Sequence, residues 1–493
     1  MKTNKFKLLS ALIAVFLLGY LRPNAQTYQP NWQSLEQRGI PEWFHRDKFG
    51  IFIHWGIYAV PAYAPVIKNS GESYAEWYWY RLHENNKHFR VFHDQQYGRD
   101  FSYPDFAKDF KTELFDAQQW ASVFKRSGAK YVVLTSKHHD GYCLWPSKEA
   151  DRHWGRPWNA VSGAPGRDLA GELTDAVKAS GLRMGFYYSL YEWFNPLWQA
   201  DKQLFIEQHM FPQFKDLVMR YQPSLIFSDG EWDLEDKDWR SEELLAWLYN
   251  ESPVAKDVVV NDRWGKHTRG THNGAMYTTS EYGSGMDASI VWEENQGIGN
   301  SYGYNRNESI EDYKTGAELK LLLVDVVARG GNLLLNVGPR ADGRIPVYME
   351  NCLLEIGEWL AANGESIYGT TAYKTPYQWS AGKAREQKGG HYMTGYNVAD
   401  QVKKGGEYAH IEAFFTKKGK DLYCIVPGVD GDTFVLKDFT LPKSAKATFL
   451  GSDKALPARQ RGSDCHIDLS DVRLGEADGK LFVIKVGGAL QAD

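Results

Sequence analysis

The feature that most constrains this chain is a long alternation of short apolar runs with longer segments of helical spacing. The apolar runs predict strands and the segments between them predict helices. We expect strands at 49–54, 130–136, 182–189, 224–228, 257–261, 276–279 and 331–337, and helices at 117–127, 171–180, 205–221, 242–249, 309–328 and 347–363. Strands that alternate with helices in this way predict an α/β protein with a parallel sheet.

Polar or charged side chains follow the carboxyl ends of most of these predicted strands. They are His54, Trp55, Lys137, His138, His139, Asp140, Tyr188, Ser189, Asp229, Asp262, Arg263, Glu281 and Asn336. In a (β/α) barrel the carboxyl ends of the strands meet on one face, and that face carries the active site. The sequence therefore predicts a (β/α) TIM-like barrel over residues 26–370, in preference to an open sheet.

The character of the sequence changes after about residue 370. The remainder is rich in Gly, Lys and Asp, and turns separate short strand-like runs such as 422–426, 433–436 and 480–486. This pattern predicts a C-terminal antiparallel β-sandwich over residues 371–493.

The first 25 residues have the pattern of a signal peptide. Lys2, Lys5 and Lys7 precede an apolar run at 8–20, which is too short to span a bilayer comfortably, and Ala25 offers a small residue for cleavage. We expect export to the periplasm or the medium, and a membrane anchor is the less favoured alternative.

Composition narrows the classes of partner. The net charge of -5, with both signs interspersed, gives no electrostatic reason to expect nucleic acid or an anionic membrane surface. No stretch after the signal peptide is long and apolar enough to insert into a membrane. Aromatic residues make up 14% of the chain, which favours sugar binding and a large ordinary core about equally. Nothing in the sequence indicates an oligomeric state.

The four cysteines, at 143, 352, 424 and 465, lie far apart and have no metal-binding spacing. Disulfides therefore do not build the fold, and buried free thiols are favoured over a single bridge.

Three carboxylates are candidates for acid–base or nucleophilic chemistry. Hydrolysis of a glycosidic bond by the common mechanism needs two carboxyl groups that flank the bond. Asp229 ends a buried run next to Phe227 and precedes a glycine, which fits a nucleophile held at the rim of a pocket, although a structural loop residue is the alternative. Glu281 follows another strand-like run and is favoured as the second carboxyl group, with Glu293 beside Trp292 as its competitor.

Other candidates would bind a ligand. His54, His138 and His139 are suited to sugar hydroxyls, although structural loop histidines and a catalytic metal site are alternatives. Adjacent histidines on an extended segment point to opposite sides, which makes His138 and His139 poor joint ligands, and a metal-dependent hydrolase is the weaker interpretation. Glu76 and Trp77 pair an acceptor with an aromatic plate, and Trp77 has packing on the barrel as its alternative. Arg263 offers a donor fork, with a structural ion pair as its alternative.

Several of these runs together resemble family 29 of the glycoside hydrolases, the retaining α-L-fucosidases. They are KFGIFIHWGIYAVPAYA (48–64), SKHHDGYCLWPS (136–147), GFYYSLYEW (185–193), LIFSDGEWD (225–233), VVVNDRWG (258–265) and GNLLLNVGPRADGRIP (331–346). The resemblance is collinear from about residue 32 to residue 368. It implies an irregular (β/α) barrel followed by a β-sandwich, and an exo-α-L-fucosidase that releases terminal L-fucose from a fucosylated oligosaccharide or glycoconjugate without a cofactor.

The resemblance also implies roles for individual residues. Asp229 falls on the nucleophile of the double displacement, and Glu281 on the acid/base, with Glu293 as second choice. The positions that would bind fucose are His54, Glu76, Trp77, His138, His139, Tyr188 (in preference to Tyr187), Arg263 and Tyr302, to which Phe227 is added from its place beside Asp229. A non-catalytic fucose-binding protein on the same scaffold is the alternative function.

Overall fold

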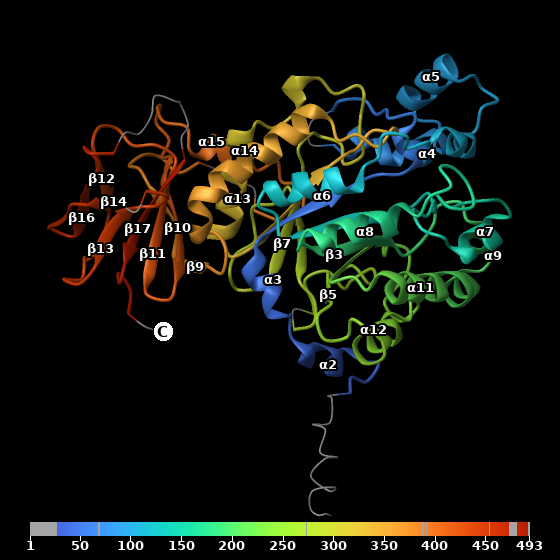
Figure 1. Cartoon of the computed structure of the whole chain (residues 1–493), viewed down its shortest axis with the longest axis horizontal. Coiled ribbons are helices and arrows are strands. Elements are labelled where there is room, and N and C mark those ends of the chain that lie inside the picture. The colour runs from blue at the N-terminus through green and yellow to red at the C-terminus, as the bar shows by residue number, and fades with distance from the viewer. Residues whose placement is uncertain are drawn as a thin grey trace, which may run out of the picture.

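The computed structural model describes residues 27–67, 70–272, 274–385, 389–390, 392–452, 454–472 and 481–491. The predicted signal peptide at 1–25 lies outside these residues. Two parts lie side by side in Figure 1, a larger α/β part in blue to gold and a smaller part of antiparallel sheets in orange to red.

The larger part is built on a curled sheet of eight parallel strands in the order β5-β4-β3-β2-β1-β8-β7-β6. The strands are β1 (Phe49–Ile53), β2 (Tyr131–Lys137), β3 (Arg183–Ser189), β4 (Leu225–Asp229), β5 (Val259–Val260), β6 (Thr278–Glu281), β7 (Trp292–Gly297) and β8 (Asn332–Val337). Each of the predicted strands overlaps one of these. The pattern of apolar runs does not predict β7, because most of its residues are polar although all of them are buried.

Both faces of this sheet are covered, since the side chains of its strands are almost all buried. Alternate side chains point into the barrel or toward the surrounding helices. The inward side chains of the strands pack with Trp43 and Phe44, from the helix before β1, in one cluster: Trp43, Phe44, Phe52, Tyr131, Val133, Tyr187, Leu225, Phe227, Val259, Tyr277 and Leu334. The interior of the barrel is therefore a packed core.

The barrel closes weakly between β5 and β6. One parallel bridge joins Asn261 to Tyr277, whose N–H donates to Val260 O at 3.1 Å. One residue further up, the Asp262 carboxylate accepts from the N–H of Thr279 at 3.1 Å and from its Oγ1 at 2.9 Å. The Asp262 side chain thus replaces the backbone hydrogen bonds that would otherwise join β5 to β6. Beyond this point, toward its carboxyl end, β6 is not paired with β5.

Helices surround the sheet, as the predicted alternation requires. They are α2 (Trp32–Leu35), α3 (Glu42–Asp47), α4 (Tyr78–His83), α5 (Lys87–Gln96), α6 (Ala117–Arg126), α7 (Lys148–Trp154), α8 (Leu169–Ala179), α9 (Pro196–Ala200), α10 (Lys202–Phe205), α11 (Phe211–Tyr221), α12 (Ser241–Asn250), α13 (Gly316–Ala328) and α14 (Val347–Asn363). The helix predicted at 309–328 begins only at Gly316, where Thr315 and Glu318 form a capping box.

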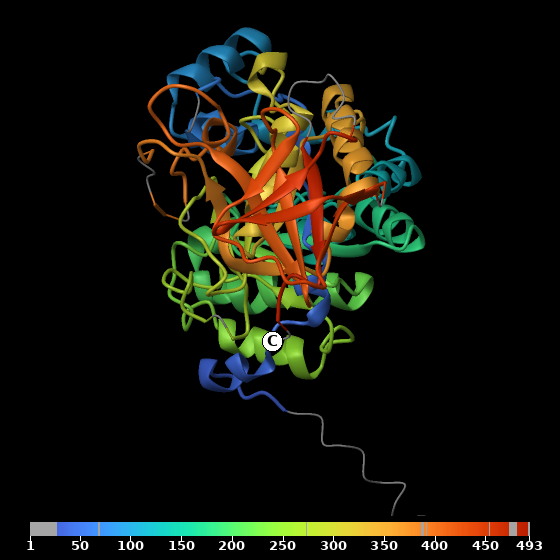
Figure 2. The ribbon, with the colours of Figure 1, turned by 90° about the vertical axis from the view of Figure 1, so that its left-hand side faces the viewer.

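The smaller part begins with β9 (Thr371–Trp379) and packs on α13. Its other elements are α15 (Val398–Gln401), β10 (Ile411–Lys418), β11 (Asp421–Val426), β12 (Thr433–Leu436), β13 (Lys446–Phe449), β14 (Lys454–Leu456), β15 (Ala458–Arg461), β16 (Asp464–Asp468) and β17 (Phe482–Gly487). The strands form two antiparallel sheets, β14-β13-β17-β11-β10-β9 and β12-β16-β15, which face the viewer in Figure 2. A separate apolar cluster from strands of both sheets fills the space between them. The predicted fold class, a barrel followed by a β-sandwich, is confirmed.

The structure also tests the predictions on the state of the cysteines and on membrane-spanning segments. All four cysteines are buried and carry free thiols, as predicted. None of the helices within the described residues combines the length and the apolar character needed to cross a bilayer.

Candidate active site

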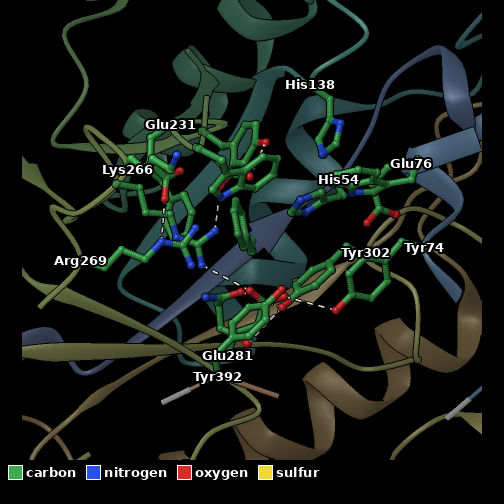
Figure 3. Close-up of a pocket in the computed structure, with 18 residues that line it drawn as sticks. His54, Tyr74, Glu76, His138, Glu231, Lys266, Arg269, Glu281, Tyr302 and Tyr392 are labelled. Carbon is green, nitrogen blue, oxygen red and sulfur yellow. Dashed lines mark hydrogen bonds and ion pairs between the residues drawn. The ribbon is translucent and has the colours of Figure 1, made fainter. Parts of the chain in front are cut away.

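A cavity of about 330 Å³ opens at the carboxyl ends of the barrel strands. Figure 3 draws the 18 residues that line it. They are Phe52, His54, Tyr74, Glu76, Trp77, His138, Tyr187, Phe227, Asp229, Glu231, Trp232, Arg263, Lys266, Arg269, Glu281, Asn295, Tyr302 and Tyr392. The position of the cavity is the one that the ring of polar strand ends predicts.

Asp229 is the last residue of β4, and a tight turn follows it. Gly230 has a φ of +75°, and a Cβ at this position would lie 2.4 Å from the ring of Tyr191. Only glycine combines that backbone conformation with so close a neighbour. The strand and this turn therefore fix the Asp229 carboxylate at the wall of the cavity.

The surroundings of Asp229 keep its carboxylate charged. Arg263 Nη1 donates to Asp229 Oδ1 at 2.9 Å, and Tyr187 Oη donates to Oδ2 at 2.8 Å. His139 Nε2 lies 3.5 Å from the same Oδ2. Burial by itself would raise the pKa of Asp229, but the charge of Arg263 and the contact with His139 hold the pKa well below its usual range.

Glu281 ends β6 and lies next to Asp229 across the same guanidinium. Arg263 Nη2 is 3.3 Å from Glu281 Oε2, and Tyr74 Oη donates to Oε1 at 3.3 Å. Arg263 is itself oriented by Thr279, whose Oγ1 accepts from Nε at 3.1 Å. One fixed cation thus contacts two carboxylates from different strands, with the cavity in front of both.

Glu293 is placed differently from Glu281. It lies inside β7, is fully buried, and does not line the cavity. Tyr131 donates its hydroxyl to Glu293 Oε2, while Oε1 has no hydrogen-bond partner among the described residues. Burial raises the pKa of Glu293 to about 8. The structure gives this second-choice residue no access to a ligand in the cavity.

Two of the three candidate histidines, His54 and His138, line the cavity, whereas His139 does not line it but contacts Asp229. His54 Nδ1 donates to Asn336 Oδ1 at 2.7 Å, and His139 Nδ1 lies 2.6 Å from Ser189 Oγ. His138 Nδ1 has no partner within the described part of the chain. Burial lowers the pKa of all three, that of His54 to about 3. They are therefore neutral hydrogen-bonding groups at neutral pH.

Glu76 closes the cavity beside His54 (Figure 3). Its Oε2 accepts from the N–H of Gly303 at 2.8 Å and lies 3.4 Å from Ser301 Oγ. Burial raises the pKa of Glu76 to about 7, although these hydrogen bonds oppose the shift.

Aromatic rings form the remaining walls. Trp77 lies 5.9 Å from Trp232 between ring centroids, on the side of His139. Phe227 carries the Arg263 guanidinium over its face at 5.1 Å. Tyr302 is held by a hydrogen bond from its Oη to Asn295 Oδ1 at 2.7 Å and packs edge-on against Tyr74. Flat apolar surfaces next to fixed polar groups suit a sugar ring.

The choice of Tyr188 from the sequence is corrected by the structure. Tyr188 points out of the barrel, where its Oη donates to Gln213 Oε1 at 2.8 Å. Tyr187 points inward and lines the cavity. Successive residues of a strand face opposite sides, and a one-residue choice of register therefore reverses the assignment.

Besides Tyr187, seven residues line the cavity that were not among the predicted site residues. They are Phe52, Tyr74, Glu231, Trp232, Lys266, Arg269 and Asn295. An eighth, Tyr392, comes from the C-terminal region. Glu231 lies two residues after Asp229 in the chain, and its carboxylate accepts from Arg269 Nε at 2.6 Å at the cavity wall. Phe52 alternates inward on β1, and this periodicity could have identified it; no sequence signal marks Tyr392.

Metal ligation was a weaker alternative for the histidines. Among the described residues, no group of three or more His, Cys, Asp or Glu side chains is arranged to hold a metal ion.

Comparison with known proteins places the chain in a family. A family model described as α-L-fucosidase matches residues 17–365. An α-L-fucosidase of Dictyostelium discoideum is 46% identical over 362 residues, which cover 71% of this chain and 76% of the relative. A putative α-L-fucosidase of Caenorhabditis elegans is 37% identical over 93% of this chain and 92% of its own.

A solved structure agrees with these sequences. The crystal structure of the Thermotoga maritima α-fucosidase in complex with a mechanism-based inhibitor has a TM-score of 0.75 and is 33% identical, over 93% of this chain and 100% of its own. The extent of these matches, with the motifs at the strand ends, confirms the resemblance seen in the sequence. This chain belongs to the α-L-fucosidase family, family 29 of the glycoside hydrolases.

Proposed function

We propose that the protein is an exo-acting, retaining α-L-fucosidase in which Asp229 is the nucleophile and Glu281 the acid/base. The observation that carries the proposal is the guanidinium of Arg263, which contacts both carboxylates at the carboxyl ends of β4 and β6. Two carboxyl groups close together on one cavity fit a double displacement, in which no water is needed between them in the first step.

In the first step Asp229 Oδ attacks the anomeric carbon of the fucosyl group. Glu281, in its protonated form, donates its proton to the glycosidic oxygen as the bond to the leaving group breaks. A covalent fucosyl ester on Asp229 forms with inverted configuration. Since Arg263 and Tyr187 keep Asp229 ionised, its electron pair is available without prior loss of a proton.

In the second step Glu281 is an ionised carboxylate and removes a proton from water. The water attacks the anomeric carbon, the ester bond to Asp229 breaks, and the second inversion gives overall retention. Arg263 stays in contact with the carboxylates through both steps and stabilises the negative charge that moves between them.

Neutral donors and acceptors would hold the fucose hydroxyls. His54, His138 and Glu76 lie together on one side of the cavity (Figure 3), and His138 Nδ1 is buried without a protein partner among the described residues. A hydroxyl of the sugar would satisfy that atom. The rings of Phe227 and Tyr302 offer an apolar surface for the methyl group at C5, where a hexose would carry a polar CH2OH.

Two other carboxylates line the cavity and must be weighed as the acid/base. Glu76 accepts a backbone hydrogen bond from Gly303, and Glu231 accepts from Arg269. Neither of them contacts the cation that holds Asp229, whereas Glu281 does. We therefore assign the acid/base role to Glu281, and azide rescue of the separate variants, described below, distinguishes these carboxylates.

The experiment that tests the function is hydrolysis of an aryl α-L-fucoside followed by proton NMR. We expect α-L-fucose as the first product, before mutarotation. The Asp229→Gly variant should lose at least about a thousandfold in kcat. Azide should restore part of that activity and yield the β-fucosyl azide, because azide then attacks from the face that Asp229 normally occupies.

The alternative, a non-catalytic fucose-binding protein, gives the opposite result. It would bind fucose and release none from any fucoside, and Asp229→Gly would then change affinity alone. A first product of β configuration would exclude a retaining mechanism.

We also infer that residues 1–25 direct export, to the periplasm or the medium. The support is the basic start, the apolar run at 8–20 and the small residue Ala25. The exported protein should begin near Gln26 by N-terminal sequencing, and Ile13→Arg should keep the chain inside the cell at its full length. If the unaltered protein is found in the cytoplasm at the mass of the full 493-residue chain, this inference is contradicted.

A further inference from the structure

A short segment of the C-terminal part runs along the upper end of β6. The N–H of Met393 donates to Glu281 O at 2.8 Å, and the N–H of Thr394 donates to Tyr282 O at 3.2 Å. Gly390 O accepts from the N–H groups of Ser284 and Gly285 at 2.9 and 2.7 Å. A parallel bridge joins Tyr392 to Glu281.

This contact follows from the way the barrel closes. Above Asp262, β6 has no partner from β5, and its free backbone groups need hydrogen bonds. The segment from the C-terminal part supplies them. It approaches so closely that a Cβ on Gly285 would lie 2.6 Å from the N atom of Gly390. The backbone beside Tyr392 is thus fixed to the strand that carries Glu281.

The side chain of Tyr392 stands at the mouth of the cavity. Tyr392 lines the cavity yet is 52% exposed, whereas Asp229 and Glu281 are 7% and 6% exposed. Figure 3 shows its ring beside Glu281, on the side away from His138 and Glu76. The ring therefore lies outside the group of residues that would hold the fucose and next to the one that would protonate the leaving oxygen.

We propose that Tyr392 is a specificity-determining residue whose ring stacks on the leaving group and favours a sugar ring there. This inference rests on the proposed function, because it takes Glu281 to mark the side on which the leaving group departs. An exposed aromatic face beside a proton donor suits the C–H face of a pyranose. The C-terminal part then contributes directly to substrate choice in the barrel.

The electrostatic surroundings agree with this location. The negative charge of Glu281 is the largest cause that raises the pKa of Tyr392, to about 12. The phenol is therefore neutral at working pH, and its Oη is available to a sugar hydroxyl while its ring provides the stacking surface.

The test compares two kinds of substrate in the full-length protein. α-L-Fucosyl fluoride has no leaving-group ring, whereas α1,2-, α1,3-, α1,4- and α1,6-fucosyl disaccharides each carry one. For Tyr392→Ala, the ratio of kcat/KM for the best disaccharide to kcat/KM for fucosyl fluoride should fall by roughly fivefold to tenfold. Tyr392→Phe should keep the ratio within about twofold, since the ring remains.

Tyr408→Ala is the matched control, because Tyr408 is another exposed tyrosine of the C-terminal part, 39% exposed, that does not line the cavity. It should leave the ratio unchanged. An unchanged ratio in Tyr392→Ala, with or without an equal loss on both substrates, would overturn the inference. Failure of the unaltered enzyme to hydrolyse fucosyl fluoride and every disaccharide would instead overturn the proposed function.

Discussion

The two ends of the barrel interior hold buried carboxyl groups in opposite settings. At the carboxyl end, Asp229 and Glu281 share Arg263 and face a cavity. Toward the amino end, Glu293 lies between Tyr131 and Tyr277, and no cationic side chain of the described residues forms an ion pair with it. β6 and β7 are neighbours, and Glu293 pairs with Thr279, two residues before Glu281.

The difference shows that the height of a carboxyl group along a strand decides what it can do. Asp229 is held ionised by a paired charge, whereas burial keeps Glu293 protonated at neutral pH. Proton donation to a substrate and nucleophilic attack both need contact with a ligand, which only the upper end provides. The following predictions test this contrast in order of decreasing effect on activity.

The largest of these effects is expected at Glu281. Glu281→Ala should lower kcat/KM for a fucoside with a poor leaving group by about a hundredfold to ten-thousandfold, because the leaving oxygen is no longer protonated. Azide should restore turnover of an activated fucoside and give the α-fucosyl azide, since Asp229 still forms the first intermediate. Glu293→Ala, Glu76→Ala and Glu231→Ala should show no such rescue, and azide rescue of any one of them, without rescue of Glu281→Ala, would move the acid/base to that residue.

Arg263→Gln should lower kcat/KM by roughly a hundredfold and move the acid limb of the pH profile to higher pH. Without the adjacent positive charge the pKa of Asp229 rises, and protonation then removes the nucleophile at a higher pH as the solution is made more acid. The measurement is kcat/KM between pH 3 and pH 7. Arg269→Gln is the control and should shift the limb less, because Arg269 contacts Glu231. An unmoved acid limb in Arg263→Gln would show that Arg263 does not hold the Asp229 pKa down.

Tyr187 and Tyr188 offer a matched pair of adjacent tyrosines. Tyr187→Phe removes the hydrogen bond to Asp229 and should lower kcat/KM by about tenfold. Tyr188→Phe removes only a bond to Gln213 outside the barrel and should change kcat/KM by less than about twofold. Steady-state kinetics on one aryl fucoside decides between them, and a larger loss in Tyr188→Phe would restore the original choice from the sequence.

Glu293→Gln should leave kcat/KM nearly unchanged and alter the pH dependence of stability. The folded-state pKa of about 8 lies above the unfolded value, so the folded protein binds more protons and loses stability as the pH rises between the two values. Relative to Glu293→Gln, the free energy of unfolding of the natural protein should fall by up to about 4 kcal/mol from pH 5 to pH 8, at roughly 1.4 kcal/mol per pKa unit. Denaturant titrations at both pH values measure this. A parallel pH dependence in the two proteins would mean that Glu293 is charged or hydrated inside the barrel.

Sequence reasoning was strongest where one residue type and one local pattern suffice. Asp229 could be identified because an apolar strand, a carboxylate and Gly230 follow one another, and the structure places it at the cavity wall. The same reasoning failed at β7, because its polar side chains are buried and hydrogen-bonded there: Glu293 accepts from Tyr131, and Asn295 accepts from Tyr302. It also chose the wrong residue of the pair Tyr187 and Tyr188, because two adjacent tyrosines do not reveal in the sequence which of them points into the barrel.

The class of fold, the family and the strand ends that carry the site could all be inferred from the amino-acid sequence. These depend on periodicity and on side-chain types close together in the chain, which a linear reading contains. Which side chains face the cavity became clear from the three-dimensional arrangement: Tyr187 lines it in place of Tyr188, and Glu281 lines it whereas Glu293 is buried away from it. This arrangement also brings Tyr392 beside Glu281, because hydrogen bonds between distant segments and the incomplete closure of the barrel set that contact.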